Sequence, residues 1–224
     1  MREVRTPEET IIDKALYLAL LDLAAHRKGD VVVGNRIKCM KLPFLVEYPM
    51  FEDKKKGFNL VFFQYEHGPI SKHIYEIWRD LEAVGCIIFR EKNWIQLTQD
   101  GHNIASTFIS EVLEDQRNSY FSERIKEIAK KYGEWGSVTS VVYDMEVYAQ
   151  ELGRYMKVRE VPMGVTFTYV LDDEEAATKI YIPPSWLETL AIELNPINVR
   201  SITNALEDYR LGKILSHEEV WERV

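Results

Sequence analysis

The sequence predicts an α+β fold: a mainly helical, winged-helix-like domain over residues 1–133, followed by a small acidic hairpin-plus-helices region over residues 134–224. Two observations predict it. Between residues 71 and 114 the pattern reads helix, β-hairpin, helix, which is the order of a winged-helix module. Residues 1–133 hold 20 Lys+Arg and 20 Asp+Glu, whereas residues 134–224 hold 8 and 16, so the net charge of −8 belongs to the second part.

The first predicted helix runs from about residue 8 to residue 27. Thr6-Pro7-Glu8-Glu9 offers a capping threonine, a proline at the first helical position and a glutamate at the third. The helix is apolar nearly all round, which is typical of a central helix. A second helix is predicted from about residue 35 to residue 51, and Pro43 is expected to kink or restart it. The run "FNLVFFQY" that follows is β-rich and continuously apolar, which indicates a buried strand.

The stretch "YEHGPISKHIYEIWRDLEAVGCIIFREKNWIQLTQDG" contains the winged-helix order. Ser71 is expected to cap a helix that ends at Gly85. The runs "CIIF" and "WIQLT", joined by residues 90–93, predict a β-hairpin. Thr98 is expected to cap the next helix, which continues to about residue 114.

The C-terminal part is predicted to mix helices with one hairpin. Residues 117–153 indicate two helices around the turn "YGEWGS". "VTFTYVL", residues 165–171, alternates apolar and polar side chains, and "TKIYI", residues 178–182, is its expected hairpin partner across the loop "DDEEAA".

The chain then shows three helix signals in succession. Pro183-Pro184 is expected to start a helix to about residue 194, and Asn195-Pro196 another to residue 211. Gly212 is the residue type that most easily takes the left-handed conformation after a last turn. Ser216 and Glu219 have the spacing of a capping box, which predicts a short final helix.

Composition argues against several classes of protein. A hydrophobic content of 46% is enough for a sizeable core. No signal peptide and no apolar run of about 20 residues is present, so we expect a cytoplasmic protein that does not bind membranes. Cys39 and Cys86 have no CxxC partner and are expected to be core thiols, ahead of a disulfide or a nucleophile.

The sequence predicts no enzyme activity, no cofactor and no metal. His67 and His73 lie six residues apart across a Gly-Pro break, which matches no metal-ligand spacing. GxSxG, HExxH and a Gly-rich phosphate loop are all absent. The acids Asp172–Glu175 fall in an expected hairpin loop, where a solvated turn is favoured over a catalytic pair of carboxylates.

DNA binding is left open. The candidate contacts on the predicted recognition helix and on the turn of the hairpin are Lys72, His73, Tyr75, Arg79, Arg90, Lys92 and Asn93. Several acids lie among them, and residues 1–133 carry no net positive charge to drive phosphate binding. A winged helix that binds protein instead of DNA has the same elements.

Three motifs resemble those of the Panacea domain, the SocA-like antitoxin domain of bacterial and phage toxin–antitoxin systems. They are Lys41-Leu42-Pro43-Phe44-Leu45, the segment Tyr65 to Pro69 that contains Gly-Pro, and the helix end Leu81 to Ile87. The resemblance covers about residues 10–115. It implies a domain that neutralises a toxin.

A second resemblance covers about residues 200–224 and concerns the closing segment of small type II antitoxins of the RelB and prevent-host-death kind. The residues that carry it are Ala205, Leu206, Glu207, Gly212, Lys213, Ser216, Glu218, Glu219 and Val220. The two resemblances involve different parts of the chain and imply the same function.

We therefore predict an antitoxin that binds a cognate protein toxin and occludes its active surface. Repression of its own operon is left open as a second role. The expected partner-binding residues are Tyr209, Arg210, Glu218, Glu219 and Trp221. A short helix around Trp221 needs its ring buried against something, and an acidic region suits a basic partner. The alternative is a winged-helix transcription regulator without a toxin. A homo-oligomer is also left open.

Overall fold

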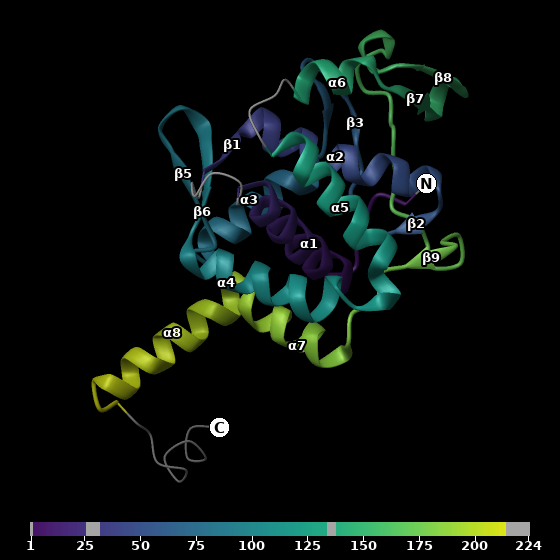
Figure 1. The fold of residues 1–224 in the computed structure, drawn as a ribbon. Helices are drawn as coiled ribbons and strands as arrows, with labels where there is room; N and C mark the ends of the chain where they lie inside the picture. The colour runs from purple at the N-terminus through teal and green to yellow at the C-terminus, as the bar shows by residue number, and fades with distance from the viewer. Residues whose placement is uncertain (1, 26–31, 134–137, 214–224) are drawn as a thin grey trace.

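The computed structural model describes residues 2–25, 32–133 and 138–213, and within these ranges it is an α+β protein dominated by helices (Figure 1). The helices are α1 (Pro7–Ala25), α2 (Arg36–Glu52), α3 (Lys72–Ala83), α4 (Gln99–Phe108), α5 (Ser119–Tyr132), α6 (Val138–Asp144), α7 (Pro184–Glu193) and α8 (Pro196–Arg210). The strands are β1 (Val32–Asn35), β2 (Lys55–Lys56), β3 (Phe63–Tyr65), β4 (Gly68–Ile70), β5 (Ile87–Arg90), β6 (Trp94–Leu97), β7 (Glu146–Ala149), β8 (Arg154–Lys157) and β9 (Thr178–Lys179). Of the helices described, none is long and apolar enough to cross a membrane.

Helix α1 lies at the centre of the fold, with α2, α4 and α5 around it (Figure 1). Its predicted capping box is confirmed: the Glu9 amide donates to Thr6 Oγ1 at 3.1 Å, and the Thr6 amide donates to Glu9 Oε2 at 2.7 Å. From Asp13 to Asp22 every side chain of α1 is buried. The apolar-all-round pattern therefore predicted its position correctly.

Helix α2 continues through two prolines, so of the two expected effects of Pro43, a kink or a restart, the restart does not occur. A proline inside a helix leaves the carbonyl four residues earlier without its usual donor. Here the carbonyl of Cys39 accepts from the Tyr17 hydroxyl at 3.2 Å. The carbonyl of Leu45, four residues before Pro49, accepts from Arg124 of α5 at 3.0 Å. Side chains from the neighbouring helices thus replace both missing backbone bonds.

The order α3, β5, β6, α4 appears as the sequence predicted. Strands β5 and β6 pair antiparallel, and β1 adds to the other edge of β6. Thr98 Oγ1 accepts from the Gly101 amide at 3.0 Å, which confirms the cap of α4. The side chain of Ser71 precedes α3 but makes no capping bond in the described structure. Gly85 has the left-handed φ of 77° where α3 gives way to the hairpin.

The hairpin predicted between residues 165–171 and 178–182 is wrong. Thr166 bridges Phe63, and Val170 bridges Arg2, so the first segment lies against chain more than a hundred residues earlier. Thr178–Lys179 instead forms β9, which pairs parallel with β2. Most of the run "FNLVFFQY" is buried as expected, although Tyr65 at its end is 47% exposed. Only this end enters a ladder, as β3.

The C-terminal elements share one apolar core with the N-terminal ones. Val147, Phe167, Leu190 and Leu194 are buried in the same cluster as the side chains of α1. A buried lysine of α1, Lys14, donates to the Leu194 carbonyl at 2.9 Å. This bond fixes the end of α7 on α1 and therefore fixes where α8 leaves the core.

Candidate protein-binding surface

Helix α8 has clear signals at both ends. Asn195 Oδ1 accepts from the Ile197 amide at 3.0 Å, and Pro196 occupies the first helical position. At the other end Gly212 has a φ of 69°, its amide donates to the Tyr209 carbonyl, and the Lys213 amide donates to the Asp208 carbonyl. These two bonds are the Schellman pattern, so the prediction for Gly212 is confirmed.

The helix before it is held firmly by the core. Leu190 lies on α7 and Leu194 directly follows its last residue, and both side chains are 0% exposed. Asn198, in the first turn of α8, donates to the Ala191 carbonyl at 2.9 Å and couples the two helices. The direction of α8 is thus set at its root.

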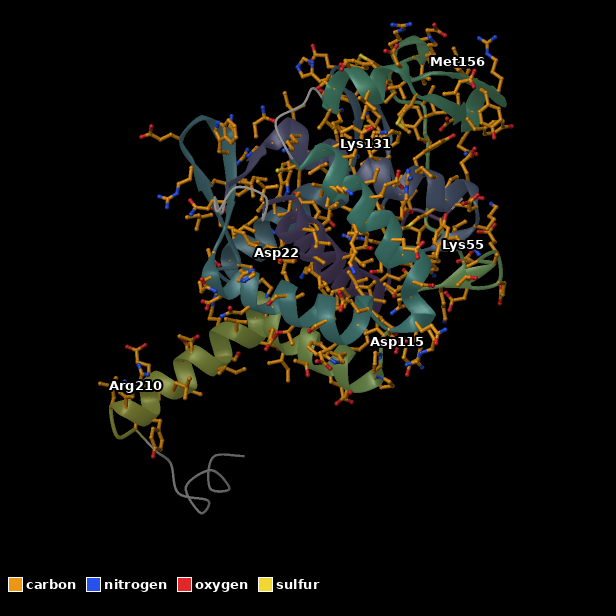
Figure 2. The ribbon with its side chains drawn as sticks, viewed as in Figure 1. Asp22, Lys55, Asp115, Lys131, Met156 and Arg210 are labelled. Atoms are coloured by element: carbon orange, nitrogen blue, oxygen red, sulfur yellow. The ribbon has the colours of Figure 1, made fainter. Side chains whose placement is uncertain are left out.

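Beyond that root, α8 extends away from the rest of the chain (Figure 1). Among the described residues, α8 buries no side chain, and Figure 2 shows its side chains reaching outward along its length as far as Arg210. A lone helix of about 15 residues is only marginally stable in water. Helix α8 therefore has the features of an element that gains its packing from a partner.

Four apolar residues of α8 gather on one face, whereas Ile197, which is 74% exposed in the first turn, lies on the other side. Ile202, Leu206 and Tyr209 are 46%, 53% and 69% exposed, and half-buried Val199 precedes them at the same spacing. Steps of three and four residues place all four in one line along a helix. We call Val199, Ile202, Leu206 and Tyr209 the α8 stripe. The polar side chain of Asn204 lies on the opposite side.

The acidic excess of the C-terminal part does not lie on α8. Arg200 and Arg210 balance Glu207 and Asp208 there. Four consecutive acids, Asp172–Glu175, lie instead in the loop before β9. The surface that α8 offers is therefore apolar and close to neutral.

Of the predicted partner-binding residues, the structure describes two. Tyr209 belongs to the α8 stripe, and Arg210 is exposed beside it. Glu218, Glu219 and Trp221, together with the capping box of Ser216 and Glu219, lie outside the described residues. Sequence reasoning missed Ile202 and Val199, although their spacing from Leu206 and Tyr209 is a readable signal.

The predicted DNA contacts lie on α3 and on the β5–β6 turn. Lys72, Tyr75 and Arg79 are exposed on α3, and Arg90 and Asn93 are exposed at the turn. The side chain of Lys92 lies outside the described structure. The exposed acids Glu76, Glu82 and Glu91 lie on the same two elements.

Three of these candidate contacts are already bonded to a neighbouring side chain or are partly buried. Arg79 forms an ion pair with Asp80 at 3.1 Å, and Arg90 donates to Gln96 at 2.7 Å. His73 is half-buried instead of facing out. Burial and the nearby Arg5 guanidinium lower the pKa of His73 to about 4, so it is neutral at physiological pH and brings no charge to a phosphate.

The strongest titratable cluster is in the core and was not visible in the sequence. Asp13 of α1 is fully buried, pairs with Arg5 at 2.9 Å and accepts from the Asn59 amide at 2.7 Å. Burial raises the pKa of Asp13 to about 6, against the effect of Arg5 and Asn59. Burial, with the nearby Asp13 charge, also raises the pKa of Glu47. These buried carboxyl groups make the stability of the fold depend on pH, and they lie away from the α8 stripe.

Comparison of the chain with protein-family models, with curated proteins and with solved structures finds no match in any of the three. Within the ranges that the structure describes, no three His, Cys, Asp or Glu side chains are grouped so that they could hold a metal ion.

Proposed function

We propose that this protein is an antitoxin, which binds a cognate protein toxin through α8 and neutralises it by covering its active surface. The observation that carries the proposal is the α8 stripe: a line of apolar side chains on a helix that leaves the core and has no fully buried side chain in the part of it that the structure describes. Inhibition by occlusion needs a stable interface with a few buried apolar contacts and needs no catalytic group.

The stripe fits the way in which helices bind grooves. An amphipathic helix places side chains at positions i, i+3 or i+4, and i+7 into an apolar groove. Ile202, Leu206 and Tyr209 have this spacing and are the most exposed part of the stripe. Because α8 is close to neutral, apolar burial supplies the affinity of this contact. Charge steering comes from other parts of the acidic surface.

The test is binding to the product of the neighbouring reading frame, with two matched variants. Leu206→Asp places a carboxylate in the stripe, and Asn204→Asp places the same charge on the opposite side of α8. We expect Leu206→Asp to weaken toxin binding by about 30-fold or more, because burying an unpaired charge at the centre of an interface costs about 2 kcal/mol or more. Asn204→Asp should leave the affinity within about threefold. Equal effects of the two variants would contradict the proposal.

A second candidate function is DNA binding by a winged-helix-like module. It is favoured by the order α3, β5, β6, α4 and by the exposure of Lys72, Arg79 and Arg90 along that surface. In an antitoxin this would allow repression of its own operon; without a toxin it would make the protein a regulator. Arg79→Glu with Arg90→Glu should then abolish the shift of an upstream duplex, and Arg200→Glu on α8 should not. A duplex shift that both variants leave intact would exclude this surface.

A further inference from the structure

The α8 stripe has a spacing that is the same from either end of the helix. Its members, Val199, Ile202, Leu206 and Tyr209, follow one another at intervals of three, four and three residues. An antiparallel second copy of α8, centred on residue 204, therefore brings each member of the stripe level with a member of the other stripe. The stripe has the symmetry that an interface between two identical chains requires.

The side chains that meet in this arrangement are complementary in size. Val199, the smallest member of the stripe, lies level with Tyr209 of the second copy, the largest member. Ile202 lies level with Leu206 of the second copy. Val199 is half-buried at the root of α8, whereas Tyr209 is 69% exposed near its end. Each exposed ring therefore gains the root of the other helix as a packing surface.

The charges beside the stripe also fit an antiparallel copy. Arg200, Glu207 and Arg210 each lie one position after a member of the stripe, so they share one flank of α8. In an antiparallel pair related by a two-fold axis this flank meets the same flank of the second copy. Glu207 then lies within one residue of the level of Arg200 of the second copy, and this pair of opposite charges occurs twice.

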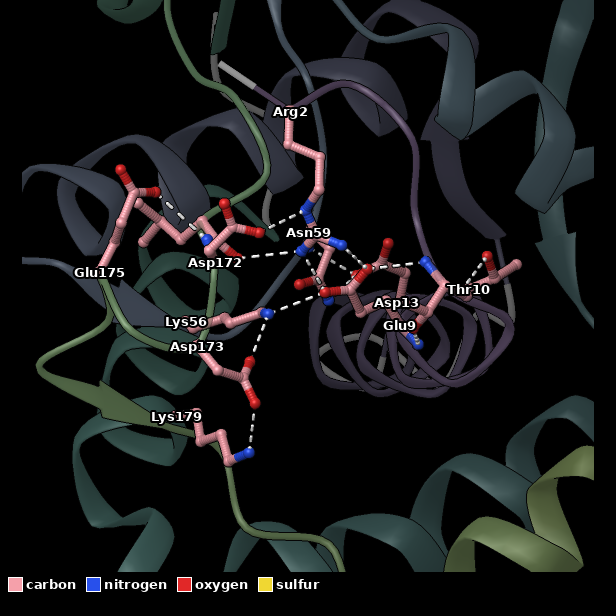
Figure 3. A network of polar contacts seen from close by, with 12 residues as sticks. Arg2, Glu9, Thr10, Asp13, Lys56, Asn59, Asp172, Asp173, Glu175 and Lys179 are labelled. Carbon is pink, nitrogen blue, oxygen red and sulfur yellow. Dashed lines mark hydrogen bonds and ion pairs between the residues drawn. The ribbon is translucent and has the colours of Figure 1, made fainter.

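The net charge of −8 does not prevent two copies from approaching through α8. The four consecutive acids Asp172–Glu175 lie in the loop before β9, away from α8 (Figure 1). Asp173 in this loop pairs with Lys56 at 2.7 Å and with Lys179 at 2.6 Å (Figure 3). Charges further apart than about 8 Å are largely screened at physiological ionic strength. Repulsion between the acidic loops of two copies is therefore small.

The interface that α8 offers is small. Its 15 residues give a length of about 22 Å, and a helix is about 10 Å wide. Two such helices bury less than the roughly 1,200 Å² of a stable interface of standard size. The dissociation constant is therefore expected to be micromolar or weaker. A weak pair separates readily and leaves the stripe available to another protein.

We propose that, without toxin, two copies of this chain pair through α8 as an antiparallel dimer in which the two stripes cover each other. The toxin then takes the place of the second copy, and this displacement rests on the proposed antitoxin function. The pairing itself depends on the stripe alone. Because one stripe cannot contact both at once, self-pairing and toxin binding compete by mass action.

Sedimentation equilibrium of the full chain without toxin measures the pairing. We expect the average mass to rise from 26.2 kDa towards twice that value as the concentration rises from the micromolar to the millimolar range. Leu206→Asp should weaken pairing at least about 30-fold, because it places an unpaired charge in the contact. Asn204→Asp, on the opposite side of α8, should change it by less than about threefold. Thermal unfolding checks that both variants are folded. A natural chain that stays monomeric at millimolar concentration, or equal loss in the two variants, would overturn the proposal.

A mixture of two variants tests the antiparallel register. Ile202→Lys alone should pair as weakly as Leu206→Asp alone, because either homodimer would bury two unpaired charges. In an equimolar mixture the new lysine of one chain lies level with the new aspartate of the other, and an isoleucine still meets a leucine at the second contact. We expect the mixture to pair at least about tenfold more tightly than either variant alone. No gain on mixing would rule out this register.

Titration with the product of the neighbouring reading frame separates this inference from the proposed function. We expect that protein to convert the dimer into a complex that contains one copy of the chain. A dimer that does not bind that protein supports the pairing and contradicts the proposed function. A chain that binds that protein but never pairs with itself contradicts the inference and leaves the proposed function standing.

Discussion

Replacing the two most exposed residues of the α8 stripe should leave the fold intact. Leu206 and Tyr209 are 53% and 69% exposed, and surface changes of this kind alter the free energy of unfolding by about 0.5 kcal/mol each. The double variant Leu206→Ser, Tyr209→Ser should therefore lose about 1 kcal/mol, which lowers the melting temperature by about 2–4 °C in a chain of this size.

Leu190 provides the contrast, because it is 0% exposed and lies on α7, the helix that directly precedes α8. Leu190→Ala should cost about 2–5 kcal/mol through the cavity that it leaves, or about 4–20 °C. Thermal and urea unfolding of the free protein, followed by circular dichroism, measures both variants. If the α8 double variant melted as low as Leu190→Ala, the stripe would belong to the protein's own core and the argument for a partner surface would fail.

Three further predictions concern the core. Gly101→Ala should destabilise the protein by about 3 kcal/mol, because the added Cβ would lie 2.1 Å from the Cys86 carbonyl oxygen, and urea unfolding tests this. Burial raises the pKa of Asp13 from 3.8 to about 6, so its contribution to stability is full below the unfolded pKa and falls by about 3 kcal/mol as pH rises through 6; Glu47 shifts in the same direction, and Asp13→Asn should flatten the pH curve of unfolding. Burial raises the pKa of the Cys39 and Cys86 thiols to about 12, so a thiol reagent at about pH 8 should label both only after unfolding, and fast labelling of the native protein would contradict their placement.

Local signals predicted where helices begin and end. The capping box at Thr6 and Glu9, the cap at Thr98 and the glycine at 212 all act within one turn of the chain, so nearby residue types determine them. These features needed no knowledge of the rest of the fold.

Partner choice was not predictable from the same patterns. The alternation in residues 165–171 indicates an extended segment but does not say what it lies against, and the Phe167 amide donates to the carbonyl of distant Phe62. The prolines of α2 are similar: Pro43 is tolerated because Tyr17 supplies a hydroxyl from another helix. A local rule fails where a tertiary contact replaces the missing bond.

The candidate surface was only partly predictable, because the sequence does not show which side chains a tertiary contact covers. Tyr209 and Arg210 were expected to contact a partner from the resemblance of residues 200–224 to antitoxin tails. Leu190 and Leu206 are both leucines on the apolar side of a helix, yet Leu190 is buried and Leu206 is exposed. Periodicity identifies an apolar face but does not identify the molecule that covers it, so only the direction of α8 showed that the stripe is exposed.

The most direct measurement of the central claim is growth of cells that express the toxic neighbouring reading frame together with this protein. The antitoxin account predicts that the natural sequence restores growth, that Asn204→Asp also restores it, and that Leu206→Asp fails although the variant accumulates as a folded protein. Growth that is restored equally by Leu206→Asp, or a neighbour whose toxicity the natural sequence does not relieve, would contradict the account.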